Sequence, residues 1–417
     1  MNQQSVSLNT LAIDNRNTSI PEGWFRTRLS RVVTFKNGAD YRDVESASPG
    51  YPVYGSGGRF KWATEWLHDG PSVLFGRKGT INRPLYVDEK FWTIDTMYYS
   101  VPNQSLVAPK FLYYWATRIP FAYYATDTAL PSITQGDLGS EELLLPPLSE
   151  QQQIADYLDH ETAEIDAFIM DLDSFISLLH ESLGAIRSEL FGKPTTHETI
   201  SLKRLARQVS GSGFPHDYQG DPAQEIPFFK VGSLKDSVDG KLADSPNTVS
   251  TSTAKALGAM IFPENTVVLA KIGAALFLNR TARLGKPSCI DNNMLGLIPH
   301  PGVNPEFLQG IISNMDLVPL GNPGAVPSLN MAWYREQPAW LPSYTNQQKI
   351  VETYRGKKDD ISSLITGANR AIGLARERRA ALITAAVTGQ IDVAAKHKPA
   401  AEQIEDDIAQ GLHREYA

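Results

Sequence analysis

Apolar residues recur at alternating spacings of four and three along one long stretch of the chain, and nine of its ten seam positions are apolar. This average spacing of 3.5, sustained over more than four heptads, predicts a long helix that buries a narrow seam against another helix. Pro146-Pro147 disfavours helix upstream, and Ser149 and Gln152 have the spacing of a capping box at its start. The seam comprises Leu158, Thr162, Ile165, Ile169, Leu172, Ile176, Leu179, Leu183, Ile186 and Leu190.

A second stretch repeats this pattern 196 residues further on. Leu341-Pro342 corresponds to Leu145-Pro146, and Thr345 and Gln348 occupy the capping-box positions. Small residues replace several large ones, so bulky side chains on one helix can fill small spaces on the other. The larger apolar members of both seams form the expected coiled-coil interface. The second seam comprises Tyr354, Lys358, Ile361, Ile365, Ala368, Ile372, Ala375, Arg379, Leu382 and Ala386.

The two stretches also differ in charge. Ser149–Lys193 has two basic and ten acidic residues, whereas Tyr344–Gln390 has eight basic and four acidic residues. Opposite charge favours pairing the two helices with each other over self-association. The alternative is two unrelated amphipathic helices, each packed on the core of its own domain.

Similarity at this offset extends beyond the helices, which predicts two copies of one module, each a globular region followed by a long helix. One further match, shifted by two residues, is looser. The matched pairs are Pro109-Lys-Phe-Leu112 with Pro305-Glu-Phe-Leu308, Ala129-Leu-Pro-Ser-Ile133 with Ala325-Val-Pro-Ser-Leu329, Ile94-Asp95 with Ile290-Asp291, and, loosely, Phe75-Gly-Arg-Lys-Gly79 with Leu269-Ala-Lys-Ile-Gly273.

Short runs rich in aromatic and β-branched residues, separated by turn residues, predict strands in both globular regions. A proline in the first turn marks one short helix in each region, Pro109–Thr117 and Pro305–Ile312. Both regions are therefore expected to be α+β, with a turn at Gly55–Gly58. The predicted strands are Trp24–Phe35, Ser72–Gly76, Pro84–Val87, Phe91–Val101, Pro227–Val231, Thr266–Ile272, Ala275–Leu284 and Met294–Pro299.

The composition is that of a soluble globular protein, with 42% hydrophobic and 20% charged residues. A single cysteine, Cys289, excludes a disulfide framework and fits a reducing cytoplasm. We expect neither a signal peptide nor a membrane span. The net charge of −7 is unfavourable for DNA binding, but the deficit lies mostly on the first long helix. Both globular regions have balanced charges, so local basic surfaces remain compatible with the sequence.

The sequence lacks the patterns that catalysis would require. There is no G-x-x-x-x-G-K-[ST] phosphate loop and no methyl-donor motif with an Asn/Asp-Pro-Pro-aromatic segment. The eight histidines form no His-x-His or His-x-x-x-His pair, so no metal site is predicted. Val87-Asp88-Glu89-Lys90 superficially resembles a nuclease Glu-x-Lys element. Because no acidic partner for such a site lies upstream, the segment is interpreted as a charged turn. We therefore expect a non-catalytic chain.

Basic and amide side chains on loops indicate a different chemistry. Such groups contact base edges in the major groove and the neighbouring phosphates. For each single residue, a solvated turn is the competing interpretation. The candidate DNA-binding residues are Arg59, Lys61, Arg77, Lys78, Thr80, Asn82 and Arg83 in the first region, and Lys271, Asn279, Arg280 and Arg283 in the second.

The repeat, the Leu-Pro-Pro-Leu-Ser-Glu-Gln-Gln-Gln-Ile run at 145–154 with its twin at 341–350, and the segment Ala381–Asp392 together resemble one family. The chain resembles the specificity subunit of a type I restriction-modification enzyme from about Pro21 to Asp392. It departs from the family pattern in lacking the second proline after Leu341. Lys358 and Arg379 also interrupt the second seam.

The resemblance implies two target recognition domains joined by two long antiparallel coiled-coil helices, in a pseudo-two-fold internal repeat. Each domain would read one half of a bipartite site in double-stranded DNA. Two methyltransferase subunits, which carry S-adenosylmethionine, would dock on the helices, and motor-nuclease subunits would join them. This chain itself would bind no cofactor. The expected layout is a polar segment 1–20, recognition domain 21–148, helix 149–193, recognition domain 194–343, helix 344–392 and tail 393–417.

A helix of about forty residues is roughly 60 Å long, which corresponds to on the order of 17 base pairs. Such a helix can separate two half-sites by several unspecified base pairs. Two other functions remain as alternatives. One is a self-sufficient restriction-methylation protein, which the missing methyltransferase motifs disfavour, and the other is a coiled-coil adaptor with no DNA role.

Overall fold

The computed structural model describes residues 20–124, 131–192, 198–322 and 324–393. Nearly all of the expected N-terminal polar segment 1–20 and of the expected tail 393–417 lies outside these ranges. The chain divides into two compact units. Unit 1 comprises Met1–Leu172 with Asn369–Ala417, and unit 2 comprises Asp173–Ala368. The boundaries fall inside the two long helices, so each unit contains a globular part and one half of each long helix.

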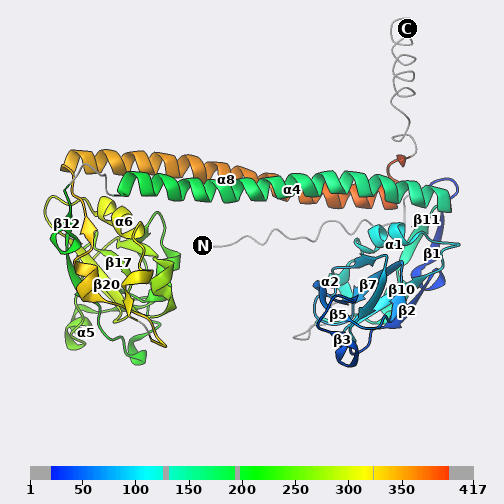
Figure 1. The fold of residues 1–417 in the computed structure, drawn as a ribbon, viewed down its shortest axis with the longest axis horizontal. Coiled ribbons are helices and arrows are strands. Elements are labelled where there is room, and N and C mark those ends of the chain that lie inside the picture. The colour runs from blue at the N-terminus through cyan, green and yellow to red at the C-terminus, as the bar shows by residue number, and fades with distance from the viewer. Residues whose placement is uncertain (1–19, 125–130, 193–197, 323, 394–417) are drawn as a thin grey trace, which may run out of the picture. The chain divides into compact units, whose positions relative to one another are not determined.

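Unit 1 is a mixed α/β structure with a central antiparallel sheet in the order β2-β10-β7-β8 and a second sheet in the order β3-β5-β4-β9-β6 (Figure 1). A two-stranded ribbon, β1-β11, precedes the first long helix. The elements are β1 Phe25–Arg28, β2 Val33–Asn37, β3 Glu45–Ser46, β4 Tyr51–Gly55, β5 Gly58–Ala63, β6 His68–Asp69, β7 Ser72–Gly76, β8 Leu85–Val87, β9 Lys90–Thr93, β10 Met97–Pro102, α1 Pro109–Ala116, α2 Phe121–Tyr124, α3 Gln135–Ser140 and β11 Glu142–Leu145.

Unit 2 has a five-stranded sheet in the order β13-β20-β17-β18-β15, a three-stranded sheet β16-β14-β19 and the ribbons β12-β23 and β21-β22. The elements are β12 Ile200–Ser201, β13 Ala206–Ser210, β14 Ile226–Phe229, β15 Lys241–Leu242, β16 Thr248–Val249, α5 Thr251–Ala256, β17 Val267–Ala270, β18 Thr281–Leu284, β19 Cys289–Ile290, β20 Met294–Pro299, α6 Pro305–Ser313, β21 Gly321–Asn322, β22 Ser328–Leu329, α7 Met331–Arg335 and β23 Pro338–Ala339.

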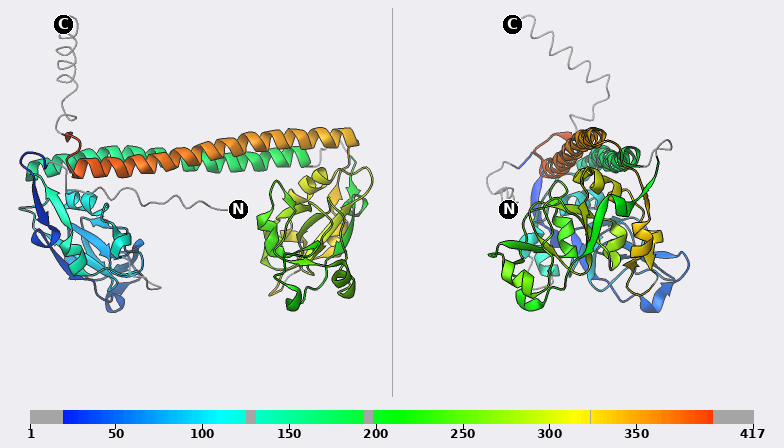
Figure 2. Two further views of the ribbon diagram at one scale, coloured as in Figure 1. Left: turned by 180° about the vertical axis from the view of Figure 1, so that it is seen from behind. Right: turned by 90° about the vertical axis from the view of Figure 1, so that its left-hand side faces the viewer.

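The long helices, α4 (Leu148–Phe191) and α8 (Tyr344–Val387), each contain 44 residues. In unit 1 the first turns of α4 and the last turns of α8 share one core, which contains Leu158 and Ala386, both fully buried. In unit 2 the end of α4 packs on the start of α8, where Phe191 and Tyr354 meet edge to face with their ring centroids 5.2 Å apart. The two helices are therefore antiparallel within each unit, as the views in Figure 2 also show.

Burial along both helices follows the heptad seams. On α4, Leu158 and Thr162 are buried, and all other seam residues from Ile165 to Leu190 are partly buried. On α8, Ile361 and Ile372 are buried, whereas the interrupting Lys358 and Arg379 are partly buried. Arg379 lies 3.0 Å from a carboxylate oxygen of Asp166 on α4. The narrow stripe explains why the rest of each helix surface is exposed to solvent.

A buried glutamine attaches each globular part to its long helix. The Gln151 side chain accepts a hydrogen bond from the backbone N–H of Ala108 and donates to the carbonyls of Leu106 and Pro146. In unit 2 the Gln347 side chain accepts from Asn304 and donates to Gly302 and Pro342. All four of these positions in unit 2 lie 196 residues after their counterparts in unit 1. In each unit, the loop before the short helix α1 or α6 is thereby fixed to the first turn of α4 or α8.

Several elements match their sequence-based predictions, and others do not. The strands predicted at Ser72–Gly76 and Met294–Pro299 are confirmed with their predicted bounds. The predicted single strand Trp24–Phe35 is wrong, because a 3-10 turn that buries Leu29 divides it. Phe91–Val101 is likewise divided, since a turn at residues 94–96 separates β9 from β10.

The strand predicted at Ala275–Leu284 is also wrong in its first half. Residues Ala274–Leu278 form a 3-10 helix between two residues with positive φ, Gly273 at 85° and Asn279 at 40°. The capping box predicted at Ser149 is also wrong. Helix α4 already begins at Leu148, which places Ser149 inside the first turn, and the Gln152 side chain donates to Asp156 instead. Within the described ranges, no helix has both the length and the apolar character that spanning a bilayer requires.

Candidate nucleic-acid interface

In unit 1, a tight turn follows the central strand β7. Its first residue, Arg77, donates its backbone N–H to Thr96 at 2.8 Å, and the carbonyl of Arg77 accepts from Ile133 at 3.1 Å. Gly79, at the end of the turn, donates to Pro131 at 2.9 Å and has a φ of 82°. A residue with a Cβ adopts this left-handed conformation only with strain, so glycine suits the position. We call residues 77–79 the strand-end turn of unit 1.

Residues 271–273 form the strand-end turn of unit 2, after β17, with the same backbone connections. Lys271 donates to Asn293, and its carbonyl accepts from Leu329, both at 2.8 Å. Gly273 has a φ of 85° and donates to Pro327 at 2.8 Å. The loose sequence match that required a shift of two residues therefore corresponds to the same local structure in both units. In each unit, a basic residue leads the turn.

The side chains at and after the turn of unit 1 are accessible. Lys78, Thr80, Asn82 and Arg83 are all exposed. Arg77 is partly buried, with its guanidinium 5.8 Å from the centre of the Tyr98 ring. This loop consequently exposes two cationic and two neutral hydrogen-bonding side chains, with a third, partly buried cation beside them, and this combination suits phosphates and base edges.

The candidates of unit 2 are more constrained. The Lys271 ammonium donates to Ser210 Oγ at 2.7 Å, and burial lowers the pKa of Lys271 while the Asp291 carboxylate opposes that shift. Asn279 donates its side-chain amide to the carbonyls of Ile312 and Met315, at 3.0 and 2.8 Å. Lys271 is only partly buried, so its side chain can still reach a ligand. The amide protons of Asn279, in contrast, are donated to backbone carbonyls of the protein itself.

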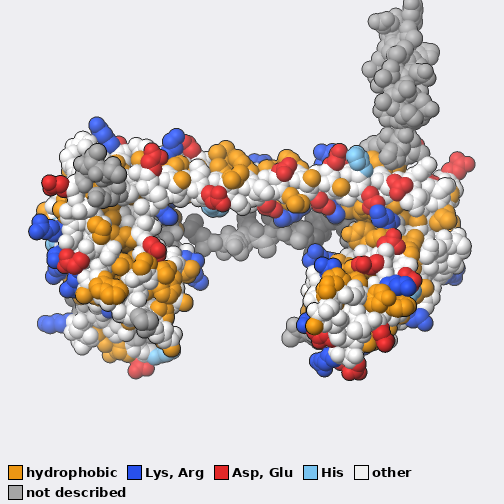
Figure 3. Space-filling view, in the orientation of Figure 1, with side chains coloured by type: hydrophobic (Ala, Val, Ile, Leu, Met, Phe, Trp, Pro, Cys, Tyr) orange, Lys and Arg blue, Asp and Glu red, His pale blue; other side chains and the backbone are white. Residues whose placement is uncertain are grey.

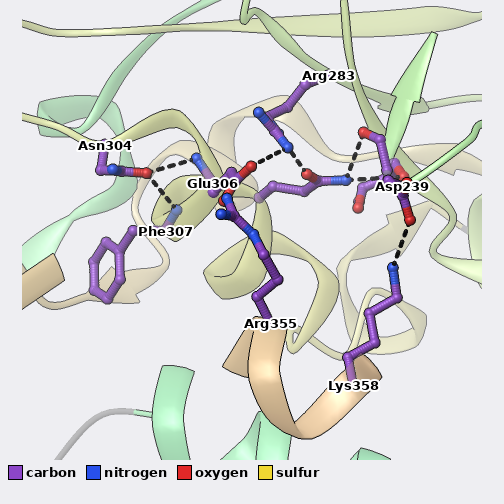
Figure 4. A network of polar contacts seen from close by, with 10 residues as sticks. Asp239, Arg283, Asn304, Glu306, Phe307, Arg355 and Lys358 are labelled. Atoms are coloured by element: carbon purple, nitrogen blue, oxygen red, sulfur yellow. Dashed lines mark hydrogen bonds and ion pairs between the residues drawn. The ribbon is translucent and has the colours of Figure 1, made fainter. Parts of the chain in front are cut away.

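Arg280 and Arg283 lie in different environments. Arg280 is exposed at the edge of an open cavity of about 950 Å³. The Arg283 side chain is 93% buried, is paired with Glu306 and donates to Gln309 at 2.9 Å (Figure 4). Burial lowers the pKa of Arg283, and the Glu306 charge counteracts this. The guanidinium of Arg283 is thus engaged within unit 2 and is not offered to a ligand.

Arg59 and Lys61 lie on β5, in the hairpin whose turn was predicted at Gly55–Gly58 and is confirmed by the pairing of these two glycines. Both basic side chains are exposed. The Arg59 guanidinium lies 4.4 Å from the centre of the Trp62 ring, and Lys61 forms an ion pair with Glu45 at 2.6 Å. Cation–π stacking of this kind leaves the outer face of the guanidinium accessible.

The structure adds two residues to this surface that sequence reasoning missed. Trp66 is 45% exposed, and the Lys90 ammonium lies 4.1 Å from the centre of its ring. The two residues are 24 positions apart, so spacing alone gives no signal of their contact. The interleaved aromatic and basic residues between 59 and 66 were the available signal for an exposed aromatic surface. Figure 3 shows basic side chains on the surfaces of both globular parts.

One group of potential metal ligands occurs among the residues that the structure describes. His160, Glu161 and Glu164 have ligand atoms within 4.8 Å of one another on α4. His160 and Glu164 are exposed and 3.5 Å apart, the spacing of an ordinary i,i+4 surface pair.

Comparison with known proteins agrees with this architecture. Residues 21–168 match the family model of the type I restriction modification DNA specificity domain. A chain solved for the "Structural basis underlying complex assembly and conformational transition of the type I R-M system" is 15% identical, with a TM-score of 0.72 over 90% of this chain and 100% of that chain. The HsdS subunit from Thermoanaerobacter tengcongensis is 13% identical, with a TM-score of 0.51 over 90% and 99%. No curated protein sequence matches significantly.

Residues 21–168 thus contain a type I restriction modification DNA specificity domain. Over 90% of its length the chain shares the fold of these two solved chains, and the matches cover 100% and 99% of them. The resemblance to type I specificity subunits drawn from the sequence is confirmed.

Proposed function

We propose that the chain is the non-catalytic DNA-specificity subunit of a type I restriction-modification complex. The observation that carries the proposal is the match of residues 21–168 to the DNA specificity domain, in a chain with the fold of type I subunits. The recognition domains are assigned to residues 21–148 and 194–343, and the helices between and after them to 149–193 and 344–392. Each recognition domain reads one half of a bipartite site in double-stranded DNA.

The pseudo-two-fold repeat in this proposal is supported by equivalent contacts in the two units. The buried glutamines Gln151 and Gln347 bond backbone groups at positions 196 residues apart. The strand-end turns, each led by a basic residue, also share their backbone connections. Side-chain donors and acceptors distinguish base edges. Two domains that share a backbone frame and differ in their side chains can therefore read two different half-sites.

The DNA contacts are proposed to come from the exposed members of the candidate set. In unit 1 these are the loop after β7 and the β5 hairpin, with Arg59, Lys78 and Arg83 as the accessible cations. In unit 2 they are the exposed Arg280 and, in addition, the partly buried Lys271. Arg283 and Asn279 are left out of the proposed contact set, since their side chains are already bonded within the protein.

The long helices are proposed to pair as an antiparallel coiled coil and to dock two methyltransferase subunits, which bind S-adenosylmethionine. Large apolar side chains away from the seam are exposed on both helices, as Figure 3 illustrates for one face. Apolar surface of this kind on a helix is typical of a protein interface. Motor-nuclease subunits are proposed to join this assembly. The exposed side chains are Phe168, Met170, Phe175, Leu178, Leu364 and Leu374.

The proposal is tested by gel-shift titration of random and genomic duplexes with the purified chain, alone and with its methyltransferase partner. Both recognition regions are neutral overall, so the isolated chain should bind weakly and lose affinity steeply as salt increases. The partner's basic surface should strengthen binding. If the two proteins co-purify but their complex binds no DNA, the alternative of a coiled-coil adaptor is favoured instead. Equal affinity with and without the methyltransferase would contradict the expected contribution of the partner.

A further inference from the structure

One ion pair between a short helix and a long helix occurs in both units with its charges exchanged. In unit 1, Lys110 of α1 forms an ion pair with Asp159 of α4. In unit 2, Glu306 of α6 forms an ion pair with Arg355 of α8, with 2.6 Å between the atoms. Each member lies 196 residues from its counterpart, since Lys110 corresponds to Glu306 and Asp159 to Arg355. Equivalent positions therefore carry opposite charges.

The exchange of sign does not arise from a different packing of the short helix. Both short helices begin at a proline, and the residue before each proline donates its backbone N–H to the buried glutamine of the long helix that follows. In unit 1 this residue is Ala108, and in unit 2 it is Asn304. The ion pair is formed two residues further along each short helix. The frame is common to both units, and only the charges differ.

The partners of each pair hold the acidic residue in place. In unit 1, Asp159 also accepts a hydrogen bond from the Tyr114 hydroxyl at 2.8 Å. In unit 2, the second carboxylate oxygen of Glu306 is paired with the buried Arg283, so this carboxylate lies between two guanidiniums (Figure 4). The side chains of Lys110 and Asp159 are 39% and 36% exposed, whereas those of Glu306 and Arg355 are 24% and 60% exposed. The carboxylate in unit 2 is thus the more strongly constrained of the two acidic groups.

An exchange of globular regions between the two helices would bring like charges together. The second region placed before α4 would set Glu306 against Asp159, and the first region placed before α8 would set Lys110 against Arg355. Each arrangement replaces an attraction with a repulsion at the same site, a common means of disfavouring a wrong partner. We propose that this ion pair, opposite in sign in the two units, makes each globular region specific for its own long helix.

The inference deepens the proposed function, because the globular regions are the parts proposed to read the half-sites. It predicts that a recognition region can be moved between the two positions of the chain only together with the matching charge on the helix. Its test measures folding stability without DNA. A failure here would leave the DNA-reading function untouched, and a failure of DNA binding would leave this inference standing.

The test compares one substitution in two full-length chains. The first is the native chain, and the second is a relocated chain in which residues 198–343 replace residues 20–147. Asp159→Arg should lower the melting temperature of the native chain and raise that of the relocated chain, each by roughly 1–3 °C. Asp171→Arg, on an exposed part of α4, is the charge-matched control and should shift both chains equally. A change of the same sign for Asp159→Arg in both chains would overturn the proposal.

If the relocated chain does not fold, a double-mutant cycle in the native chain decides the matter. Lys110→Glu and Asp159→Arg are measured singly and together by chemical denaturation. Each single change places like charges opposite each other, whereas the double change recreates the sign found in unit 2. The double variant should therefore recover most of the stability that the two single variants lose. Simple addition of the two losses would overturn the inference.

Discussion

Gln151 and Gln347 make the same three hydrogen bonds to backbone groups of their own units, although 196 residues separate them. Both side chains are fully buried. A buried amide is tolerated when its donors and acceptor are satisfied, and it then specifies one arrangement of the groups around it. These glutamines are consequently the features that fix each globular part to the start of its long helix.

Gln347→Ala should reduce the free energy of unfolding by about 1–3 kcal/mol, because it leaves the Asn304 N–H and two carbonyls without their partner. The neighbouring Gln348 is exposed, so Gln348→Ala is the matched control and should change stability little. Urea denaturation of the full-length chain measures both. Equal losses for the two variants would refute the assigned role of Gln347.

The strand-end turn of unit 2 should depend on glycine at 273. Its φ of 85° is strained for any residue with a Cβ, and Gly273→Ala should cost about 1 kcal/mol and weaken DNA binding by displacing Lys271. Gly232 has the same open surroundings without a positive φ, so Gly232→Ala should have little effect. Unfolding and gel-shift titrations of both variants make the comparison. If Gly273→Ala left the affinity for DNA unchanged, the strand-end turn of unit 2 would have no role in DNA recognition.

Exposed cations in the loop after β7 should contribute to the salt dependence of binding. Removing Lys78 or Arg83 by alanine substitution should lower the slope of log affinity against log salt by about 1 for each DNA phosphate that the side chain neutralises. Lys349→Ala on the exposed surface of α8 is the control. Titrations at several salt concentrations measure the slopes. If all three substitutions gave one common slope, these loop residues would not contact phosphates.

Cys289 should be unreactive in the folded chain. It is fully buried, and burial raises the pKa of its thiol from 9.0 to about 11. Iodoacetamide at pH 8 should therefore label it only when unit 2 unfolds. The unfolded thiol ionises at lower pH than the folded thiol, so Cys289 lowers the free energy of unfolding as the pH rises from 9 to 11. Cys289→Ala should remove this contribution to the loss of stability at high pH. Labelling at the rate of a free thiol would contradict its burial.

Much of the frame could be predicted from the sequence, because it depends on repeated local patterns. The periodicity or composition of neighbouring residues predicts the heptads of α4 and α8, the proline at the start of α1 and α6, and the strand Ser72–Gly76. The shared turn at Gly79 and Gly273 was also visible as a loose match. These features are decided by residues close together in the chain.

Other features depend on distant residues and could not be predicted. In the sequence, Gln152 has the capping-box spacing after Ser149, and only the position of the α1 loop shows that the neighbouring Gln151 is the buried hydrogen-bonding residue. Arginine is a residue type that commonly contacts DNA, but Arg283 is buried beside Glu306, which lies 23 residues away in the sequence. The break in the predicted strand at Leu29, which is fully buried, likewise follows from tertiary packing.

The exposed apolar residues of the long helices should matter for partner docking and little for stability. Leu374 is 57% exposed on α8, and Leu374→Ser should reduce co-purification with the methyltransferase while leaving the melting temperature nearly unchanged. Leu158 is fully buried, and Leu158→Ala should cost about 2–5 kcal/mol of stability. Pull-down and denaturation of both variants separate the two roles. Full retention of the methyltransferase by Leu374→Ser would remove this residue from the proposed docking surface.

The central claim, that this chain directs a methyltransferase to one bipartite DNA sequence, is most directly tested by mapping modified adenines in the genome of the host. Long-read sequencing would compare cells that contain the gene with cells from which it has been deleted. Modification should disappear completely at one motif made of two half-sites, while every other motif is unaffected. Persistence of every modified motif in the deletion strain would contradict the claim.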